Sequence, residues 1–253
     1  MTRLGLIGYP LGHSFSAEYF REKFRALHIE GKYELYPLTD IRSFPDLLTD
    51  NPDLQGLNVT IPYKEAILPY LDTLSAEASV IGAVNVIKIE YDSTGRRILS
   101  GHNSDWKGFA DSLAPLTRPD IRHALVLGTG GASKAVSYAL MKSGITVTNV
   151  SRTPVQGKSI GYQDLDNKLI SDHLLIVNTT PLGMYPQTGS YPPIPYQALT
   201  SRHICYDLVY NPEETMFMKK SAEHGATVKN GLEMLHRQAD TAWSIWNDKT
   251  DMS

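Results

Sequence analysis

Residues 123–133 read HALVLGTGGAS. The apolar run has the length of a buried strand, and small and apolar residues recur at helical spacing from Ala132 to Leu140. Glycines in the turn between them let the backbone approach a ligand closely, and the N–H groups at a helix start attract an anion such as a pyrophosphate. The stretch therefore predicts the strand–turn–helix opening of a dinucleotide-binding α/β domain. A glycine-rich turn without a ligand is the alternative.

The next predicted strand, 145–150, leads into Ser151, Arg152 and Thr153. An NAD-binding domain usually carries an Asp or Glu here for the ribose hydroxyls, and this sequence has neither. A guanidinium and two hydroxyls suit a 2′-phosphate, because Arg binds phosphate through parallel hydrogen bonds. The pattern favours NADP over NAD, unless Arg152 is only a solvated cation at a strand end.

Short apolar runs alternate with helical segments along the whole chain, which is typical of an α/β fold. In the first half the predicted strands are 4–8, 32–38, 55–59 and a hairpin of 83–89 with 97–99. After Pro115 and Pro119 the pattern restarts, with strands 123–128, 145–150, 174–178 and 203–210. We therefore expect two domains that divide near residue 103. The amphipathic helix spanning Leu232 to Trp246 is expected to pack back on the first domain.

The composition is that of an ordinary globular protein. The 253 residues are 42% hydrophobic and 20% charged, with a formal net charge of −3. That balance gives no basic face for nucleic acid, and no apolar stretch is long enough for a membrane span or a signal peptide. The single cysteine cannot form an internal disulfide, so we expect a cytoplasmic protein held together by its core.

Polar residues follow the predicted strand 55–59. Asn58 and Thr60 alternate along it toward one side, and Lys64 comes shortly after. A carbonyl that accepts hydride also needs a proton, and an ammonium held by a nearby carboxylate can supply it. Asp105, at the start of the helix after residue 103, is the candidate carboxylate. The alternatives are a solvated Lys64 and an Asp105 that only caps its helix.

Two serines precede the first predicted helix. The hydroxyls of Ser14 and Ser16, together with the helix start, suit a substrate carboxylate, although Ser16 alone is equally typical of an N-cap. The eight histidines show no metal-ligand spacing among themselves or with Cys205, which we expect inside a buried strand. No metal is predicted.

Taken together, these motifs resemble the shikimate dehydrogenase family. The resemblance covers nearly the whole chain and consists of GYPLGHSFS from Gly8, NVTIPYK from Asn58, IGAVNV from Ile81, GHNSD from Gly101, GTGGAS from Gly128, SRT from Ser151, NTTPLGM from Asn178, DLVYNP from Asp207 and NGLEMLHRQ from Asn230. It implies NADP-dependent reduction of 3-dehydroshikimate to shikimate, a step of chorismate and aromatic amino acid biosynthesis. It also implies an N-terminal α/β substrate domain (1–103 and 229–253) and a Rossmann-like NADP-binding domain (104–228), with the C-terminal helix returning to the first domain.

The resemblance assigns roles residue by residue. Lys64 and Asp105 would form the catalytic dyad. The substrate would be bound by Ser14, Ser16, Asn58, Thr60, Asn85, Tyr210 and Gln238. The cofactor would be bound by Gly128, Thr129, Gly130, Gly131, Ala132, Ser151, Arg152, Thr153, Thr179, Leu208 and Gly231.

Some positions depart from the family pattern. Ser151 replaces the more usual Asn, and Gln156 stands where some members carry a second Arg, which predicts a weaker grip on the 2′-phosphate. The alternatives to a shikimate dehydrogenase are a quinate/shikimate dehydrogenase of broader specificity and a non-catalytic module that senses shikimate. The expected partners are small molecules, with the chain as a monomer or homodimer.

Overall fold

The computed structural model describes residues 1–12 and 15–247, and it divides the chain into two compact units. The first unit contains residues 1–104 and the chain from 239 onward; the second contains 105–238. The chain returns to the first unit between Gln238 and Ala239, inside helix α8 (Leu232–Trp246). The boundary expected from the sequence lies at 228/229, before this helix begins. The fold class predicted from the sequence is confirmed, because both units are α/β.

The first unit is built on a mixed six-stranded sheet in the order β2-β1-β3-β5-β6-β4. Strands β1, β2 and β3 are mutually parallel, and β5 is antiparallel both to β3 and to β6, its partner in a hairpin. The strands are β1 (Thr2–Gly8), β2 (Gly31–Pro37), β3 (Gly56–Val59), β4 (Thr73–Leu74), β5 (Val86–Tyr91) and β6 (Arg97–His102). The predicted hairpin is therefore confirmed; its first strand lies closer to the turn at residues 92–95 than expected, and its second strand continues three residues further, to His102.

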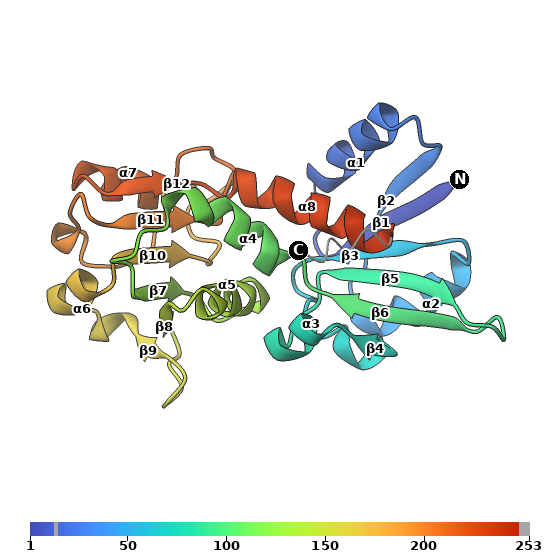
Figure 1. The fold of residues 1–253 in the computed structure, drawn as a ribbon, viewed down its shortest axis with the longest axis horizontal. Coiled ribbons are helices and arrows are strands. Elements are labelled where there is room, and N and C mark those ends of the chain that lie inside the picture. The colour runs from blue at the N-terminus through green and yellow to red at the C-terminus, as the bar shows by residue number, and fades with distance from the viewer. Residues whose placement is uncertain (13–14, 248–253) are drawn as a thin grey trace. The chain divides into compact units, whose positions relative to one another are not determined.

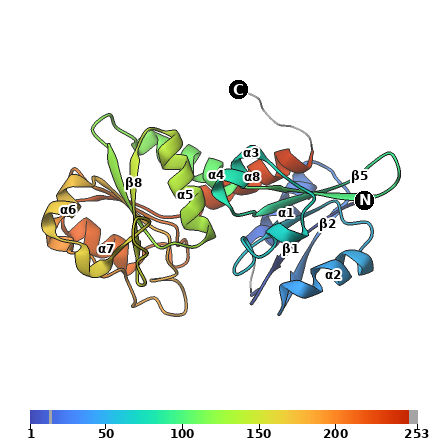
Figure 2. The ribbon, with the colours of Figure 1, turned by 90° about the horizontal axis from the view of Figure 1, so that it is seen from below.

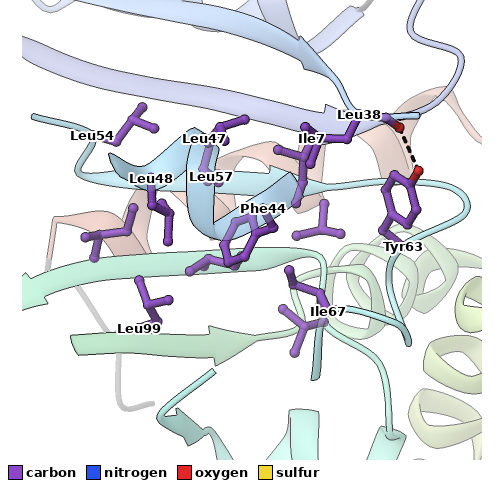
Figure 3. Close-up of a cluster of buried hydrophobic side chains, with 14 of the residues drawn as sticks. Ile7, Leu38, Phe44, Leu47, Leu48, Leu54, Leu57, Tyr63, Ile67 and Leu99 are labelled. Carbon is purple, nitrogen blue, oxygen red and sulfur yellow. Dashed lines mark hydrogen bonds between the residues drawn. The ribbon is translucent and has the colours of Figure 1, made fainter. Parts of the chain in front are cut away.

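One face of this sheet carries the larger core of the unit. Ile7 and Leu57 point from β1 and β3 toward Phe44 of helix α2 (Phe44–Asp50) (Figure 3). Ile87 of β5 belongs to the same cluster, and all four side chains are fully buried. Tyr63, after β3, is buried at the edge of this cluster, and its hydroxyl donates to the carbonyl of Leu38 at 2.6 Å (Figure 3). The loop that follows β3, where Lys64 lies, is thereby anchored to the core.

The other face is covered by α1 (Phe15–Ala26) and the end of α8. Phe20 of α1 packs with Ala239 and Ala242 of α8 in one buried cluster. The indole Nε1 of Trp246 donates to the carbonyl of Ile87 at 2.9 Å. The ring lies so close to Gly56 that a Cβ there would overlap it. The tail helix thus packs on the first unit, as predicted.

The second unit has a six-stranded, fully parallel sheet in the order β12-β11-β10-β7-β8-β9 (Figure 1). This is the strand order of a doubly wound dinucleotide-binding domain. Its strands are β7 (His123–Leu127), β8 (Thr146–Ser151), β9 (Ile160–Gly161), β10 (Leu175–Asn178), β11 (Ile204–Asp207) and β12 (Thr227–Lys229). The order reverses at β7, the strand of the glycine-rich turn, where such sheets bind ligands.

Helices cover both faces of the parallel sheet (Figure 2). One layer consists of α4 (Asp105–Leu113), α5 (Gly131–Lys142) and the start of α8; the other consists of α6 (Asn167–Asp172) and α7 (Met216–Glu223). Cys205 is fully buried in β11, as predicted. In the described part of the chain, no helix is both long and apolar enough to cross a bilayer.

The predicted strand 203–210 is too long at its end. Strand β11 stops at Asp207, because the Oδ1 atom of this side chain accepts the backbone N–H of Val209 and turns the chain. The short helices α2, α6, α7 and α3 (Ala76–Ile81) were not predicted, since six to eight residues give too few turns for a periodic pattern.

Candidate active site

Polar side chains gather at the carboxyl ends of β1 and β3 in the first unit. The two strands are parallel, so their ends meet at one edge of the sheet. Asn58 lies in β3 with 6% exposed area, and the N–H of Thr60, which follows the strand, donates to the carbonyl of Ile7 at 2.9 Å. Lys64 is half-buried, and its own carbonyl accepts the N–H of Val84 at 2.7 Å. The backbone at Lys64 is therefore fixed against the chain that leads into β5.

Asn58 and Asn85 are joined directly. The Nδ2 atom of Asn58 donates to the Asn85 carbonyl at 3.1 Å, and that carbonyl also accepts the N–H of Val59 at 2.9 Å. The side chain of Asn85 binds Ser104 twice: Nδ2 donates to the Ser104 Oγ at 2.9 Å, and Oδ1 accepts the Ser104 N–H at 2.7 Å. All three side chains are buried, so the two predicted substrate residues Asn58 and Asn85 belong to one ordered polar cluster.

Tyr33 of β2 extends this cluster, although sequence reasoning did not single it out. Its hydroxyl donates to Asn58 Oδ1 at 2.7 Å and is also hydrogen-bonded to the side chain of Ser16 at the start of α1. Burial raises the pKa of Tyr33, so the hydroxyl keeps its proton. The structure thus brings Ser16, Asn58 and Asn85 together through Tyr33. Ser14 lies outside the described residues.

Asp105 is the first residue of α4 and is buried. The two preceding residues are anchored on the first unit: Asn103 Nδ2 donates to the Ala83 carbonyl at 2.9 Å, and Ser104 is held by Asn85. The division of the chain assigns Lys64 to the first unit and Asp105 to the second. The pairing of these two side chains remains a prediction.

The other two predicted substrate residues also fall in the second unit. Tyr210 is 38% exposed, and partial burial raises the pKa of its phenol. Gln238 lies on α8, where its Nε2 donates to the Leu235 carbonyl at 2.9 Å. Its backbone packs against Gly108 of α4, where a Cβ would come within 2.8 Å of the Gln238 nitrogen. Their role in substrate binding remains a prediction.

The glycine-rich turn after β7 has the geometry that its sequence predicts. Gly128 has a φ of +115°, and its N–H donates to the Val150 carbonyl at 2.8 Å. A Cβ at Gly128 would lie 2.6 Å from the Thr179 Oγ1, which donates to the Leu127 carbonyl. Gly130, the N-cap of α5, has no side-chain cap, and a Cβ there would meet nothing within 4 Å. The turn is open beside a helix start, which suits a diphosphate.

The segment after β8 presents a cation. Ser151 is buried, and its Oγ accepts the Thr153 N–H and contacts the Thr153 carbonyl, both at 3.1 Å. The Ser151 hydroxyl therefore shapes the turn, while Arg152 and Thr153 are exposed. Burial raises the pKa of Tyr162, and the Arg152 charge opposes that rise, so the guanidinium lies near this ring. The roles of Arg152 and Thr153 in binding a phosphate remain predictions.

The last two predicted cofactor residues lie together. The Leu208 N–H donates to the Asn178 carbonyl at 2.9 Å. A Cβ on Gly231 would lie 2.1 Å from the Leu208 carbonyl oxygen, so only glycine fits there. The chain entering α8 thus runs directly beside the end of β11.

A buried carboxylate that sequence reasoning missed organises this edge of the sheet. Asp207 has no exposed area; its Oδ1 accepts from Asn178 Nδ2 at 2.9 Å and from the Val209 N–H at 3.0 Å, and its Oδ2 accepts from the Thr215 hydroxyl at 2.6 Å. Burial raises the pKa of Asp207 to about 6, and the three donors oppose that rise. Asn178 in turn binds Thr180, next to the predicted cofactor residue Thr179. Among the described residues no cluster of three or more His, Cys, Asp or Glu could hold a metal ion.

Comparison with known proteins places the chain in a family. The family model described as "Shikimate dehydrogenase substrate binding domain" matches residues 6–87. A protein of Carboxydothermus hydrogenoformans named "Shikimate dehydrogenase (NADP(+))" is 38% identical over 261 residues, which cover 96% of this chain and 90% of that protein.

Solved structures agree over the whole fold. Shikimate 5-dehydrogenase from Thermus thermophilus, in complex with NADP(H) and shikimate, is 33% identical with a TM-score of 0.84, covering 98% of this chain and 94% of that one. The 5-ketofructose reductase of Gluconobacter sp. strain CHM43 is 26% identical with a TM-score of 0.82, covering 97% and 92%. The fold alone therefore accommodates more than one reductase. The identity of 38% and 33% to the proteins of Carboxydothermus hydrogenoformans and Thermus thermophilus, over nearly the whole chain, decides the family. This chain belongs to the shikimate dehydrogenase family.

Proposed function

We propose that this chain catalyses the NADP-dependent, reversible reduction of 3-dehydroshikimate to shikimate. The observation that carries the proposal is the buried cluster of Asn58, Asn85 and Ser104 beside the anchored backbone of Lys64. A polyhydroxylated ring needs such fixed donors and acceptors, because a missing partner leaves a buried polar group unsatisfied.

The second unit contains the residues that suit the cofactor. The open turn at Gly128 and Gly130 fits a diphosphate, and the exposed Arg152 fits the 2′-phosphate that distinguishes NADP from NAD. When bound, NADPH supplies the hydride. Gly130 and the start of α5 would hold its diphosphate, and Thr179 keeps the turn in shape through its bond to the Leu127 carbonyl.

Proton transfer falls to Lys64 in this proposal. The ammonium gives a proton to the carbonyl oxygen as hydride reaches the carbon, and in the oxidation direction the amine takes the proton from the hydroxyl. Asp105 acts as its partner and keeps the ammonium oriented. The anchoring of Lys64 by Val84, and of Asn103 by Ala83, supports a fixed position for both segments.

The reaction belongs to chorismate and aromatic amino acid biosynthesis, and the chain acts on small molecules as a monomer or homodimer in the cytoplasm. The substrate domain comprises 1–103 and 229–253, and the NADP domain comprises 104–228.

A single absorbance assay at the NADPH band tests the function. In the oxidation direction, purified protein is given NADP+ or NAD+ together with shikimate or quinate. In the reduction direction, it is given NADPH together with 5-ketofructose. The expected result is the highest kcat/KM with shikimate and NADP+. No turnover with any substrate, together with measurable shikimate binding, would instead mean a sensing module, and a higher kcat/KM with quinate would mean the broader enzyme.

A further inference from the structure

The hydrogen-bond chain from Ser16 to Asn85 runs in one direction, and its direction follows from chemistry. The Asn85 carbonyl can only accept a hydrogen bond, so the Asn58 atom 3.1 Å from it must be the amide nitrogen. The amide oxygen of Asn58 then faces Tyr33, and the 2.7 Å bond between them requires the Tyr33 hydroxyl to donate. Because a phenol has one hydrogen, the Tyr33 oxygen must accept from Ser16.

The orientation of the Asn58 amide determines which of its atoms can bind a ligand. Its oxygen is bound to Tyr33, and one amide hydrogen is bound to Asn85. The second amide hydrogen has no acceptor among the described residues. Without the Tyr33 hydroxyl, the oxygen of Asn58 would lose its buried donor and the amide would no longer be held in one orientation.

The ring of Tyr33 is itself held firmly. It stacks on Phe20, with ring centroids 4.7 Å apart and an angle of 16° between the planes, and it packs in the cluster under α1 and α8. The hydroxyl therefore has a fixed position on β2, between the start of α1 and the end of β3. Because this hydroxyl is bonded to Asn58 and Ser16, its effect on a substrate passes through the side chains that it orients.

We propose that Tyr33 is a positioning residue that fixes Asn58 as a hydrogen-bond donor toward an accepting oxygen of the substrate. This inference rests on the proposed function for the identity of the substrate. It deepens that function by assigning the direction of one substrate contact. It also means that Ser16, while bonded to Tyr33, presents lone pairs to a ligand, so that it must release Tyr33 before it can donate to a carboxylate.

The test is Tyr33→Phe, which keeps the ring packing and removes the hydroxyl. One hydrogen bond of this kind is worth about a factor of ten in affinity. We expect KM for shikimate to rise about tenfold, with kcat within about twofold and KM for NADP+ unchanged, because a contact to a non-reacting oxygen acts on binding. Thermal unfolding of each variant shows whether the fold is retained.

Tyr36→Phe is the matched control. Tyr36 lies on the same strand, and its hydroxyl contacts Glu34 at 3.0 Å and Arg3 at 3.3 Å rather than Ser16 or Asn58. We expect the KM for shikimate of this variant to stay within about twofold of the parent. An equal rise in both variants would mean that loss of any hydroxyl on β2 disturbs the unit, and it would overturn the assignment.

A double-mutant cycle with Asn58→Ala separates action through Asn58 from a general effect. If Tyr33 acts through Asn58, adding Tyr33→Phe to Asn58→Ala changes KM no further. The same tenfold rise in both backgrounds, or an unchanged KM in Tyr33→Phe alone, refutes the inference. A parent protein that neither binds nor turns over shikimate would instead refute the proposed function, which keeps the two failures apart.

Should Tyr33→Phe not fold, the parent protein still tests the proposal. The Asn58 side-chain amide gives two proton resonances by NMR, one for each N–H. Titration with shikimate should shift the Asn58 proton that does not face Asn85. Shikimate binding that leaves both protons unmoved would contradict the assignment.

Discussion

Replacement of Asp207 by Asn tests the buried carboxylate at the end of β11. Asn can keep an oxygen where Oδ1 accepts from Asn178 and Val209. Its nitrogen then replaces Oδ2, which accepts the Thr215 hydroxyl at 2.6 Å, so the buried hydroxyl loses its acceptor. An unsatisfied buried hydroxyl costs about 1–3 kcal/mol in the free energy of unfolding.

Ionisation of the Asp207 carboxyl lowers the free energy of unfolding of the parent protein as pH rises. This loss offsets the cost of the substitution. Burial raises the pKa of Asp207 from 3.8 to about 6, so the folded state favours the protonated form. The resulting stability is fully present below pH 3.8 and is lost as pH rises through about 6. A pKa difference of roughly two between the folded and unfolded states corresponds to about 3 kcal/mol. Asp207→Asn should therefore be destabilising by about 1–3 kcal/mol below pH 3.8. The penalty should be about 1 kcal/mol smaller at pH 4.5, and it should fall to near zero or reverse by pH 7.5.

Urea unfolding at several pH values measures this difference. Trp106 lies in the second unit, so its fluorescence reports that unit when Trp243 and Trp246 are replaced by Phe in both proteins. Ser112→Ala is the control, because it removes the 2.7 Å bond to Tyr206, whose pKa burial raises to about 12. Its effect should not vary between pH 4.5 and 7.5. A penalty for Asp207→Asn that is equally constant would refute the raised pKa and the reasoning from burial.

Three further substitutions probe the proposed reaction, two by steady-state kinetics and one by cofactor binding. Lys64→Ala should lower kcat by about 100-fold with little change in KM, as expected for a lost general acid, and wild-type turnover would contradict that role. Arg152→Ala should raise KM for NADPH about tenfold and leave KM for NADH unchanged; an equal loss with both would contradict the 2′-phosphate contact. Gly128→Ala should weaken NADP+ binding in a fluorescence titration by about tenfold or more, because its φ of +115° and the nearby Thr179 hydroxyl both oppose a Cβ; unchanged affinity would refute this.

Much of the second unit follows from its sequence. The runs at 124–127 and 174–177 are continuously apolar, which matches strands β7 and β10, covered by helices on both faces. The glycine turn and the helix after it are where the pattern places them. The end of β11 was missed because the apolar run continues to Val209, whereas a side-chain bond from Asp207 ends the strand.

The polar connections of the site could not be predicted in the same way. Asp207 and Asn178 are 29 residues apart, and Tyr33 and Asn58 are 25 residues apart. No local sequence spacing therefore predicts either hydrogen bond. Tyr33 reads as an ordinary aromatic residue of a strand, and its role depends on strands β1, β2 and β3 lying side by side. A carboxylate in an apolar run, as at Asp207, is the one signal that could have drawn attention to that position.

The discontinuity of the first unit sets the order in which its parts leave the ribosome. Residues 105–238, which form the second unit, are complete before Ala239, Ala242 and Trp246 have been synthesised. The first unit is therefore begun first and completed last. Until then, the apolar face formed by Leu4 and Phe20 lacks its cover. Because exposed apolar surface in a nascent chain promotes aggregation, synthesis of the second half of α8, rather than the start of translation, governs when the first unit can bury this face.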